Sequence, residues 1–297
     1  MSFVADEIAS QPETWRRAVE LAADPLVAAA LPEPGARVAA VGCGTSLYVA
    51  QAYAQLRESL GLGETDAYAA SQFPRLRSYD HVLALTRSGT TTEVITLLRN
   101  LPRGARSTAV TTHTRHPVTR HASARVVLDF ADEHSVVQTR FATTTLALLR
   151  AHLGDDMRAA LGGVRDELAG EVPAGLLERE QFTFLGDGWT VGLANEAALK
   201  LRETAQMWAE SYPAMEFRHG PISVVDRRSA VWFFGPAPEG LADEVARTGA
   251  LVVESDRDPM VHLVAAQRLA VALAARRGLD PDQPRNLTRS IILPAAA

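Results

Sequence analysis

The stretch "ARVAAVGCGTSLYVAQAYAQLRES", residues 36–59, decides the fold class, because it joins two hydrophobic periodicities through a short glycine loop. "ARVAAVG" (36–42) is a short apolar run rich in valine, which predicts a buried strand. "SLYVAQAYAQLRES" (46–59) spaces its apolar residues as a helix does. A strand that leads through glycines directly into a helix is the repeating unit of an α/β fold.

The same alternation continues along the rest of the chain. We expect further strands at 81–86, 107–112, 124–130, 182–186, 229–235 and 249–255, and long helices at 135–153, 191–210 and 260–278. Strands separated by helices pair in parallel through right-handed crossovers. The sequence therefore predicts two three-layer α/β/α sandwiches, each with a mainly parallel sheet, at residues 1–165 and 166–297. The polar segment 161–175 joins them, with a partly helical structure as the alternative to a loose linker.

Composition bounds the partners and the compartment. The 297 residues carry a formal net charge of -5, and their arginines are scattered, so the basic stripe of a nucleic-acid-binding protein is absent. No apolar run approaches the roughly 20 residues that cross a bilayer, and the first residues lack the pattern of a signal peptide. The single cysteine, Cys43, excludes an internal disulfide and fits a reducing cytoplasm. We expect a cytoplasmic protein without nucleic-acid or membrane partners.

Three loops that follow expected strands are rich in glycine and hydroxyl groups. They are "VGCGTS" (41–46), "TRSGTTTE" (86–93) and "EHSVVQTRFATTT" (133–145). Ligands of open parallel sheets bind beyond the carboxyl ends of the strands, where backbone N–H groups and hydroxyls can hold an anion. The loops therefore predict a site for a phosphorylated, polyhydroxylated ligand.

Two alternative interpretations of these loops remain, helix capping and nucleotide binding. Thr90 with Glu93, and Ser135 with Gln138, fit capping boxes that would stabilise helix starts without any ligand. A nucleotide is the weaker alternative ligand, because "GCGTS" completes neither the dinucleotide fingerprint nor the P-loop pattern.

Lys200 is the only lysine of the chain and stands in "EAALKLRETAQ". Glu196, Lys200 and Glu203 are spaced by four and three residues, which places them on one face of a helix. A surface ion pair is the ordinary explanation, but arginine would serve there about as well. A desolvated ammonium can titrate toward neutral pH, whereas a guanidinium cannot, and this difference is a physical reason to retain a lysine.

Five motifs carry a resemblance to the SIS (sugar isomerase) family over nearly the whole chain. They are "VGCGTS", "TRSGTTTE", "SVVQTRFATT", "FLGDGWTVGLANEAALKLRETAQMWAESYPAMEFRHGP" and "DQPRNLTRSIIL", in this order and spacing. The chain most resembles the isomerase half of glucosamine-6-phosphate synthase and the related phosphosugar ketose/aldose isomerases and deaminases. The resemblance implies a homodimer whose active site lies at the subunit interface and needs no cofactor.

The resemblance also implies roles for individual residues. The sugar-phosphate loop corresponds to Thr86, Arg87, Ser88 and Thr91, with Ser46 and Gln138 near the sugar hydroxyls, and the substrate-binding set is completed by Gly44, Thr45, Thr139 and Arg289. Glu203 matches a proton-shuttling glutamate and Lys200 its companion. His219, in "EFRHGP", matches a histidine that the neighbouring subunit supplies to open the sugar ring. His113, His116 and His121 form an H-x-x-H pattern without an acidic cluster, so we expect no metal site.

Departures from the synthase narrow the reaction. No glutaminase domain precedes the SIS region, so we expect no glutaminase activity. Arg289 stands where the synthase has an imine-forming lysine, and an arginine forms no such imine. Arg87 replaces a glutamine, which predicts either a bidentate phosphate contact or a different ligand.

The sequence thus favours a phosphosugar isomerase or isomerising deaminase of amino-sugar metabolism. Its substrate would be a hexose or hexosamine 6-phosphate, and its chemistry an enediol-type proton transfer between C1 and C2. Two alternatives stay open: a lyase or dehydratase acting on an N-acetylated amino-sugar 6-phosphate, and a non-catalytic sensor that binds a carbohydrate derivative.

Overall fold

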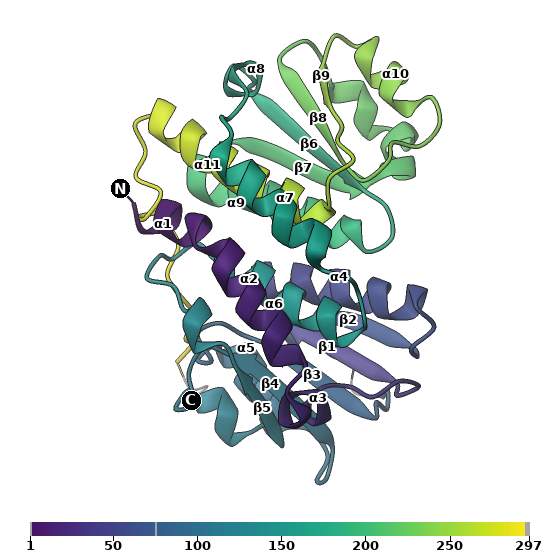
Figure 1. Cartoon of the computed structure of the whole chain (residues 1–297), viewed down its shortest axis with the longest axis vertical. Helices are drawn as coiled ribbons and strands as arrows, with labels where there is room; N and C mark the ends of the chain where they lie inside the picture. The colour runs from purple at the N-terminus through teal and green to yellow at the C-terminus, as the bar shows by residue number, and fades with distance from the viewer. Residues whose placement is uncertain (1, 75, 295–297) are drawn as a thin grey trace. The chain divides into compact units, whose positions relative to one another are not determined.

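Two parallel β-sheets organise the chain in a computed structural model that describes residues 2–74 and 76–294 (Figure 1). The first sheet has the order β2-β1-β3-β4-β5, and all its neighbours pair in parallel. Its strands are β1 (Val38–Gly42), β2 (Thr65–Ala69), β3 (His81–Leu85), β4 (Arg106–Thr111) and β5 (Ala124–Val127). β1 lies inside the sheet, so the strand predicted first is a central one.

The helices associated with the first sheet precede, connect or follow its strands along the chain. They are α2 (Gln11–Ala22), α3 (Pro25–Ala30), α4 (Thr45–Ser59), α5 (Thr92–Arg99) and α6 (Arg140–His152), with short 3₁₀ turns η1 (Ala70–Gln72), η2 (Pro117–Arg120) and η3 (Asp129–Ala131). On α5, Val94, Leu97 and Leu98 join one buried cluster with Val41 of β1 and Ala84 of β3. α4 packs against β1 and β2 and also against α6.

The second sheet has the order β7-β6-β8-β9, again with parallel neighbours. Its strands are β6 (Gln181–Gly186), β7 (Trp208–Pro213), β8 (Ser229–Phe234) and β9 (Leu251–Val253). The associated helices are α1 (Phe3–Ala9), α7 (Arg158–Ala169), α8 (Ala174–Leu177), α9 (Thr190–Ala205), α10 (Leu241–Ala246) and α11 (Pro259–Arg276), with 3₁₀ turns η4 (Ala214–His219) and η5 (Pro221–Val224). α11 packs on α9 and α7, whereas Leu241 and Val245 of α10 join a cluster with Phe233 of β8.

The first strand of each half enters its helix through the same glycine turn. A Cβ on Gly42 would lie 2.5 Å from the carbonyl carbon of Ser46, and a Cβ on Gly186 would lie 2.5 Å from that of Thr190. The second glycine of each turn, Gly44 or Gly188, has a φ of 55° or 49°, which L side chains rarely adopt. Each turn therefore requires glycine at both positions.

The prediction of two α/β sandwiches with parallel sheets is confirmed, but two strands escaped it. β2 was not expected, and the helix expected at 191–210 ends at Ala205. Gln206 takes the left-handed conformation with a φ of 52°, which stops the helix and lets the chain continue into β7. The segment 161–175 is partly helical, since α7 and α8 extend into it.

The chain divides into two compact units, each of which consists of two separate segments of the sequence. One consists of Met1–Pro12 and Arg158–Leu287, and the other of Glu13–Met157 and Thr288–Ala297. The expected boundary between residues 165 and 166 stays a prediction, and the units differ from it in where they place the two chain ends. Across residues 2–74 and 76–294, no helix is both long and apolar enough to span a bilayer.

Candidate active site

A small pocket lies at the carboxyl ends of β1 and β3, within the unit formed by residues 13–157 and 288–297. Its lining consists of Cys43, Ser46, Leu85, Thr86, Arg87, Ser88, Thr91, Val94, Gln138 and Arg289. Seven of these ten residues belong to the substrate-binding set expected from the sequence. The other three members of that set do not line the pocket: Gly44 and Thr45 form the start of α4, and Thr139 precedes α6.

The loop between β3 and α5 presents its hydroxyls in a tight turn. The Thr86 hydroxyl accepts a hydrogen bond from the Gly89 N–H at 3.2 Å, and the Ser88 and Thr91 hydroxyl oxygens lie 3.4 Å apart. Gly89 has a φ of 58°, and a Cβ there would meet the Cβ of His116 at 2.4 Å. The turn therefore requires glycine where it packs against His116, and it places the Ser88 and Thr91 hydroxyls at the start of α5.

Neither capping box expected from the sequence forms. The N-cap residue of α5 is Thr91, and the Thr90 hydroxyl lies 2.9 Å from the Ser290 hydroxyl of the C-terminal tail. α6 begins only at Arg140, five residues beyond Ser135. The two capping boxes therefore do not explain why these loops carry their hydroxyl groups.

Glu133 caps α6 instead, and the sequence analysis missed it. Its Oε1 accepts hydrogen bonds from the backbone N–H of Thr139 at 2.6 Å and of Arg140 at 2.8 Å. The Thr139 hydroxyl also donates to Oε1 at 3.1 Å. Thr139 is therefore engaged in the cap. A carboxylate seven residues before the first residue of α6 is outside any local capping pattern, so only the tertiary structure reveals it.

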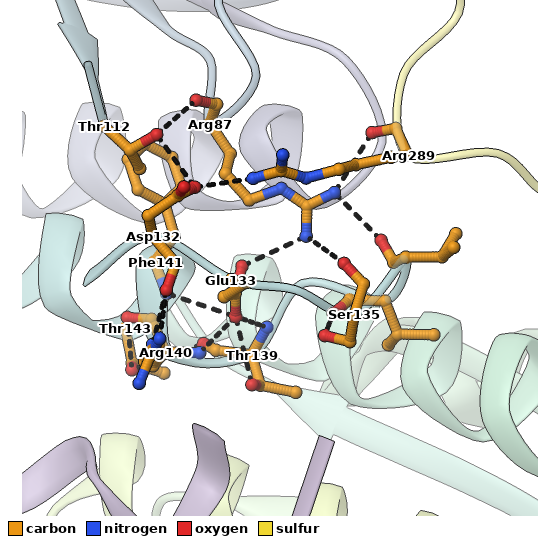
Figure 2. Close-up of polar contacts among 12 residues, drawn as sticks. Arg87, Thr112, Asp132, Glu133, Ser135, Thr139, Arg140, Phe141, Thr143 and Arg289 are labelled. Atoms are coloured by element: carbon orange, nitrogen blue, oxygen red, sulfur yellow. Dashed lines mark hydrogen bonds and ion pairs between the residues drawn. The ribbon is translucent and has the colours of Figure 1, made fainter. Parts of the chain in front are cut away.

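Arg87 lies buried at the centre of a polar network (Figure 2). Its Nη1 donates to Glu133 Oε2 and to the Ser135 carbonyl, both at 3.1 Å, and its Nη2 donates to the carbonyls of Val136 and Arg289, both at 3.0 Å. Both terminal nitrogens thus have protein partners. This geometry does not support the bidentate phosphate contact expected from the sequence.

Arg289, which belongs to the C-terminal tail, also lines the pocket. Its Nη2 lies 2.6 Å from Asp132 Oδ1, which also accepts a hydrogen bond from the Thr112 hydroxyl at 3.0 Å (Figure 2). Partial burial opposes the charge of Asp132, but Arg289 and the Thr112 hydroxyl hold the pKa of this carboxyl below its usual range. Both partners are nearly half exposed, so Arg289 is the more accessible of the two arginines.

The expected row of charges forms on α9, in the unit formed by residues 1–12 and 158–287. Lys200 Nζ lies 2.6 Å from Glu203 Oε2 and 3.3 Å from Glu196 Oε1. The side chains of Lys200 and Glu196 are each 1% exposed, whereas that of Glu203 is 19% exposed. The surface ion pair considered above is excluded, and Glu203 is the accessible member of the row.

The titration expected for Lys200 is not found. Burial disfavours its charge, but the neighbouring carboxylates Glu196 and Glu203 outweigh burial and raise the pKa above its ordinary value. Lys200 is therefore a fixed positive charge beside Glu203. Lys200 is fully buried between two carboxylates, where its compact ammonium differs in shape from a guanidinium.

His219 is exposed at the end of η4, between buried Phe217 and the 3₁₀ turn η5. The side chain of the preceding Arg218 forms an ion pair with Glu244 at 2.9 Å.

In the H-x-x-H segment, His116 Nδ1 lies 2.9 Å from the Thr111 hydroxyl, and the His116 ring lies 5.4 Å from the His113 ring. Among residues 2–74 and 76–294, no cluster of three or more His, Cys, Asp or Glu side chains is arranged to hold a metal ion.

Comparisons with known proteins identify curated relatives and solved structures that are similar to this chain. No family model matches the chain. The glutamine--fructose-6-phosphate aminotransferase [isomerizing] of Sulfurisphaera tokodaii is 29% identical over 294 residues, which cover 86% of this chain and 50% of the relative. The same enzyme of Caulobacter vibrioides is 26% identical, covering 97% of this chain and 58% of the relative. The chain therefore spans about half the length of these curated relatives.

Solved structures of the same fold cover almost the entire chain. Glucosamine-6-phosphate deaminase from Thermotoga maritima has a TM-score of 0.80 and 22% identity, covering 98% of this chain and 100% of that one. Tagatose-6-phosphate ketose/aldose isomerase from Escherichia coli has a TM-score of 0.75 and 19% identity, covering 100% and 97%. At these identities the likeness establishes the fold.

Proposed function

The chain resembles the SIS phosphosugar isomerases and deaminases over nearly its whole length, and from this premise we propose that it catalyses an isomerisation or isomerising deamination of a hexose or hexosamine 6-phosphate. The proposed chemistry is proton transfer between C1 and C2 through an enediol. We propose no activity of this chain beyond that isomerisation or isomerising deamination.

The observation that carries the proposal is the buried row of charges on α9. Lys200 is fully buried between Glu196 and Glu203. A buried ion pair adds little to the stability of a fold, because the cost of desolvating the two charges offsets their attraction, so stability alone does not explain why these charges are buried. Glu203 keeps an exposed edge, as a general base must if it is to reach a substrate carbon. In this proposal Glu203 moves the proton, and the charged Lys200 orients Glu203 and stabilises negative charge.

The hydroxyl-rich pocket supports a phosphorylated substrate. Ser88 and Thr91 stand at the N-terminus of α5, where backbone N–H groups favour an anion. Ser46 and Gln138 line the same pocket and offer hydrogen bonds to sugar hydroxyls. We assign phosphate binding to the first pair and sugar binding to the second.

Two further assignments follow the resemblance. The exposed His219 would open the sugar ring in the site of a neighbouring subunit, which makes a homodimer part of the proposal. Arg289 would contact the ligand without forming an imine, so covalent amine transfer is not part of it.

The decisive test is Glu203→Gln, which keeps the size of the side chain and removes the base. Wild-type protein is incubated in deuterated water with a panel of hexose, hexosamine and N-acetylhexosamine 6-phosphates, followed by NMR. We expect deuterium at C1 or C2 of one substrate, and a loss of turnover in the variant of about a hundredfold or more. Ammonia release would identify deamination, and loss of the C3 hydroxyl would identify the lyase alternative.

Glu178→Gln is the matched control, because Glu178 is an exposed glutamate of the same compact unit, after α8. This variant should turn over the substrate as the wild type does. Full activity in Glu203→Gln would refute the proposed mechanism.

A further inference from the structure

Arg87 connects three segments that contribute to the pocket. It follows β3 at the start of the phosphate loop, and its guanidinium bonds to Glu133, Ser135 and Val136 of one loop and to Arg289 of the C-terminal tail (Figure 2). The side chain is 1% exposed. A planar guanidinium suits this task because its donors point in fixed directions toward several acceptors at once.

The charge of Arg87 is already balanced within the protein. Glu133, whose side chain is 0% exposed, pairs with Arg87 through Oε2 and caps α6 through Oε1. Among the described atoms, Arg87 Nε is the only guanidinium nitrogen of this residue without a hydrogen-bond partner. A bidentate grip on phosphate requires two nitrogens, so binding it would require Arg87 to leave its present partners.

The C-terminal tail depends on polar bonds for its position beside the phosphate loop. The Thr92 N–H donates to the Ile291 carbonyl at 3.1 Å, and the Leu293 N–H donates to the Thr92 hydroxyl at 2.9 Å. The side chains of Ile291, Ile292 and Leu293 remain half exposed or more. Because little apolar surface holds the tail, each hydrogen bond matters for its position, including the one from Arg87 to Arg289.

We propose that Arg87 is a positioning residue, which holds Gln138 and Arg289 around the pocket and does not itself bind the phosphate. Its bonds to the backbone of Ser135 and Val136 fix the loop that carries Gln138, and its bond to the Arg289 carbonyl fixes the tail. The identity of the ligand rests on the proposed function, but the positioning role does not.

Hydrogen–deuterium exchange of the ligand-free protein tests this role without requiring turnover. In Arg87→Gln we expect amide exchange in 288–294 and 135–139 to rise about tenfold, as expected for the loss of hydrogen bonds to a charged group. Calorimetry with inorganic phosphate and with glucose 6-phosphate should show that Arg87→Gln binds the sugar phosphate more weakly than the wild type does. Arg87→Lys should restore neither property, because one ammonium cannot span these acceptors.

Arg57→Gln is the matched control. Arg57 is another fully buried arginine of the same compact unit, and it donates to the Glu33 carbonyl and the Thr65 hydroxyl, away from the pocket lining. We expect it to lower the melting temperature but to leave exchange in 288–294 unchanged. If Arg87→Gln fails to fold, the double variant Arg87→Gln/Glu133→Gln removes both buried charges and should show the same increase in exchange.

Unchanged exchange in 288–294 in a folded Arg87 variant would overturn the proposal. So would restoration of phosphate binding by Arg87→Lys, since that result would identify Arg87 as a direct ligand. If the wild type turned over no sugar phosphate, the proposed function would fail, whereas the exchange result would still decide the role of Arg87.

Discussion

At the scale of single residues, the two arginines that line the pocket each form an ion pair with one of two adjacent carboxylates. Glu133 balances buried Arg87, and Asp132 balances half-exposed Arg289. Hydroxyl-rich loops predicted most of the pocket lining from sequence. The roles of Asp132 and Glu133 could not be predicted, because their arginine partners are 157 and 46 residues away along the chain, respectively.

Lys200 also belongs to this scale and gives a prediction about pH. A group whose pKa is raised on folding keeps its stabilising charge at every pH below its unfolded pKa and loses it only as pH rises through the folded value. For Lys200 the folded value lies above the ordinary 10.5. Lys200→Arg keeps the charge but enlarges a fully buried side chain, so we expect a rate at least about tenfold lower.

The pH profiles of both proteins should be parallel between about pH 7 and pH 9. Steady-state rates over this range provide the measurement. An alkaline limb present in the wild type and absent from Lys200→Arg would show that Lys200 titrates during the reaction, contrary to this prediction.

At the scale of elements, apolar runs predicted the central strands well, whereas the two strands that were missed, β2 and β7, each lie at the edge of a sheet. The local sequence does not predict the left-handed conformation of Gln206, because glycine or asparagine usually occupies such a position. The apolar pattern therefore predicts a helix that continues through Trp208, which instead begins the edge strand β7.

The pairing of β3 with β4 gives a prediction at this scale. His81, the first residue of β3, is buried and lies 2.9 Å from the Thr108 hydroxyl of β4. Burial, with help from nearby Arg106, lowers the pKa of His81 from 6.5 to about 4. Its contribution to stability is thus complete above pH 6.5 and is lost as pH falls toward 4, which amounts to roughly 2 to 3 kcal/mol.

Urea unfolding of the wild type and of His81→Asn across this pH range isolates the effect, because the other titrating groups are common to both. The stability of the wild type should fall more steeply with decreasing pH. Equal slopes would mean that His81 is protonated in the folded state as readily as in the unfolded chain.

At the scale of the whole molecule, the proposed role of His219 predicts complementation between subunits. Glu203→Ala and His219→Ala should each be inactive alone, since each lacks one group of the proposed site. Mixed under conditions that allow subunit exchange, they should recover up to about a quarter of the wild-type activity, because a random mixture contains hybrid dimers with one intact site. Assays of the mixture, with exchange verified by mass spectrometry, provide the measurement; no recovery would refute a shared site.

The N-terminal and C-terminal segments belong to different compact units, which has a practical consequence for handling the protein. The N-terminal residues belong to the unit that carries α9, whereas the tail after Leu287 forms hydrogen bonds with Thr90 and Thr92 at the start of α5. An affinity tag at the C-terminus therefore extends a segment that lines the pocket, and one at the N-terminus extends α1 of the other unit. Purification and immobilisation are best directed through a tag placed ahead of α1, so that the tail keeps its hydrogen bonds to Thr90 and Thr92.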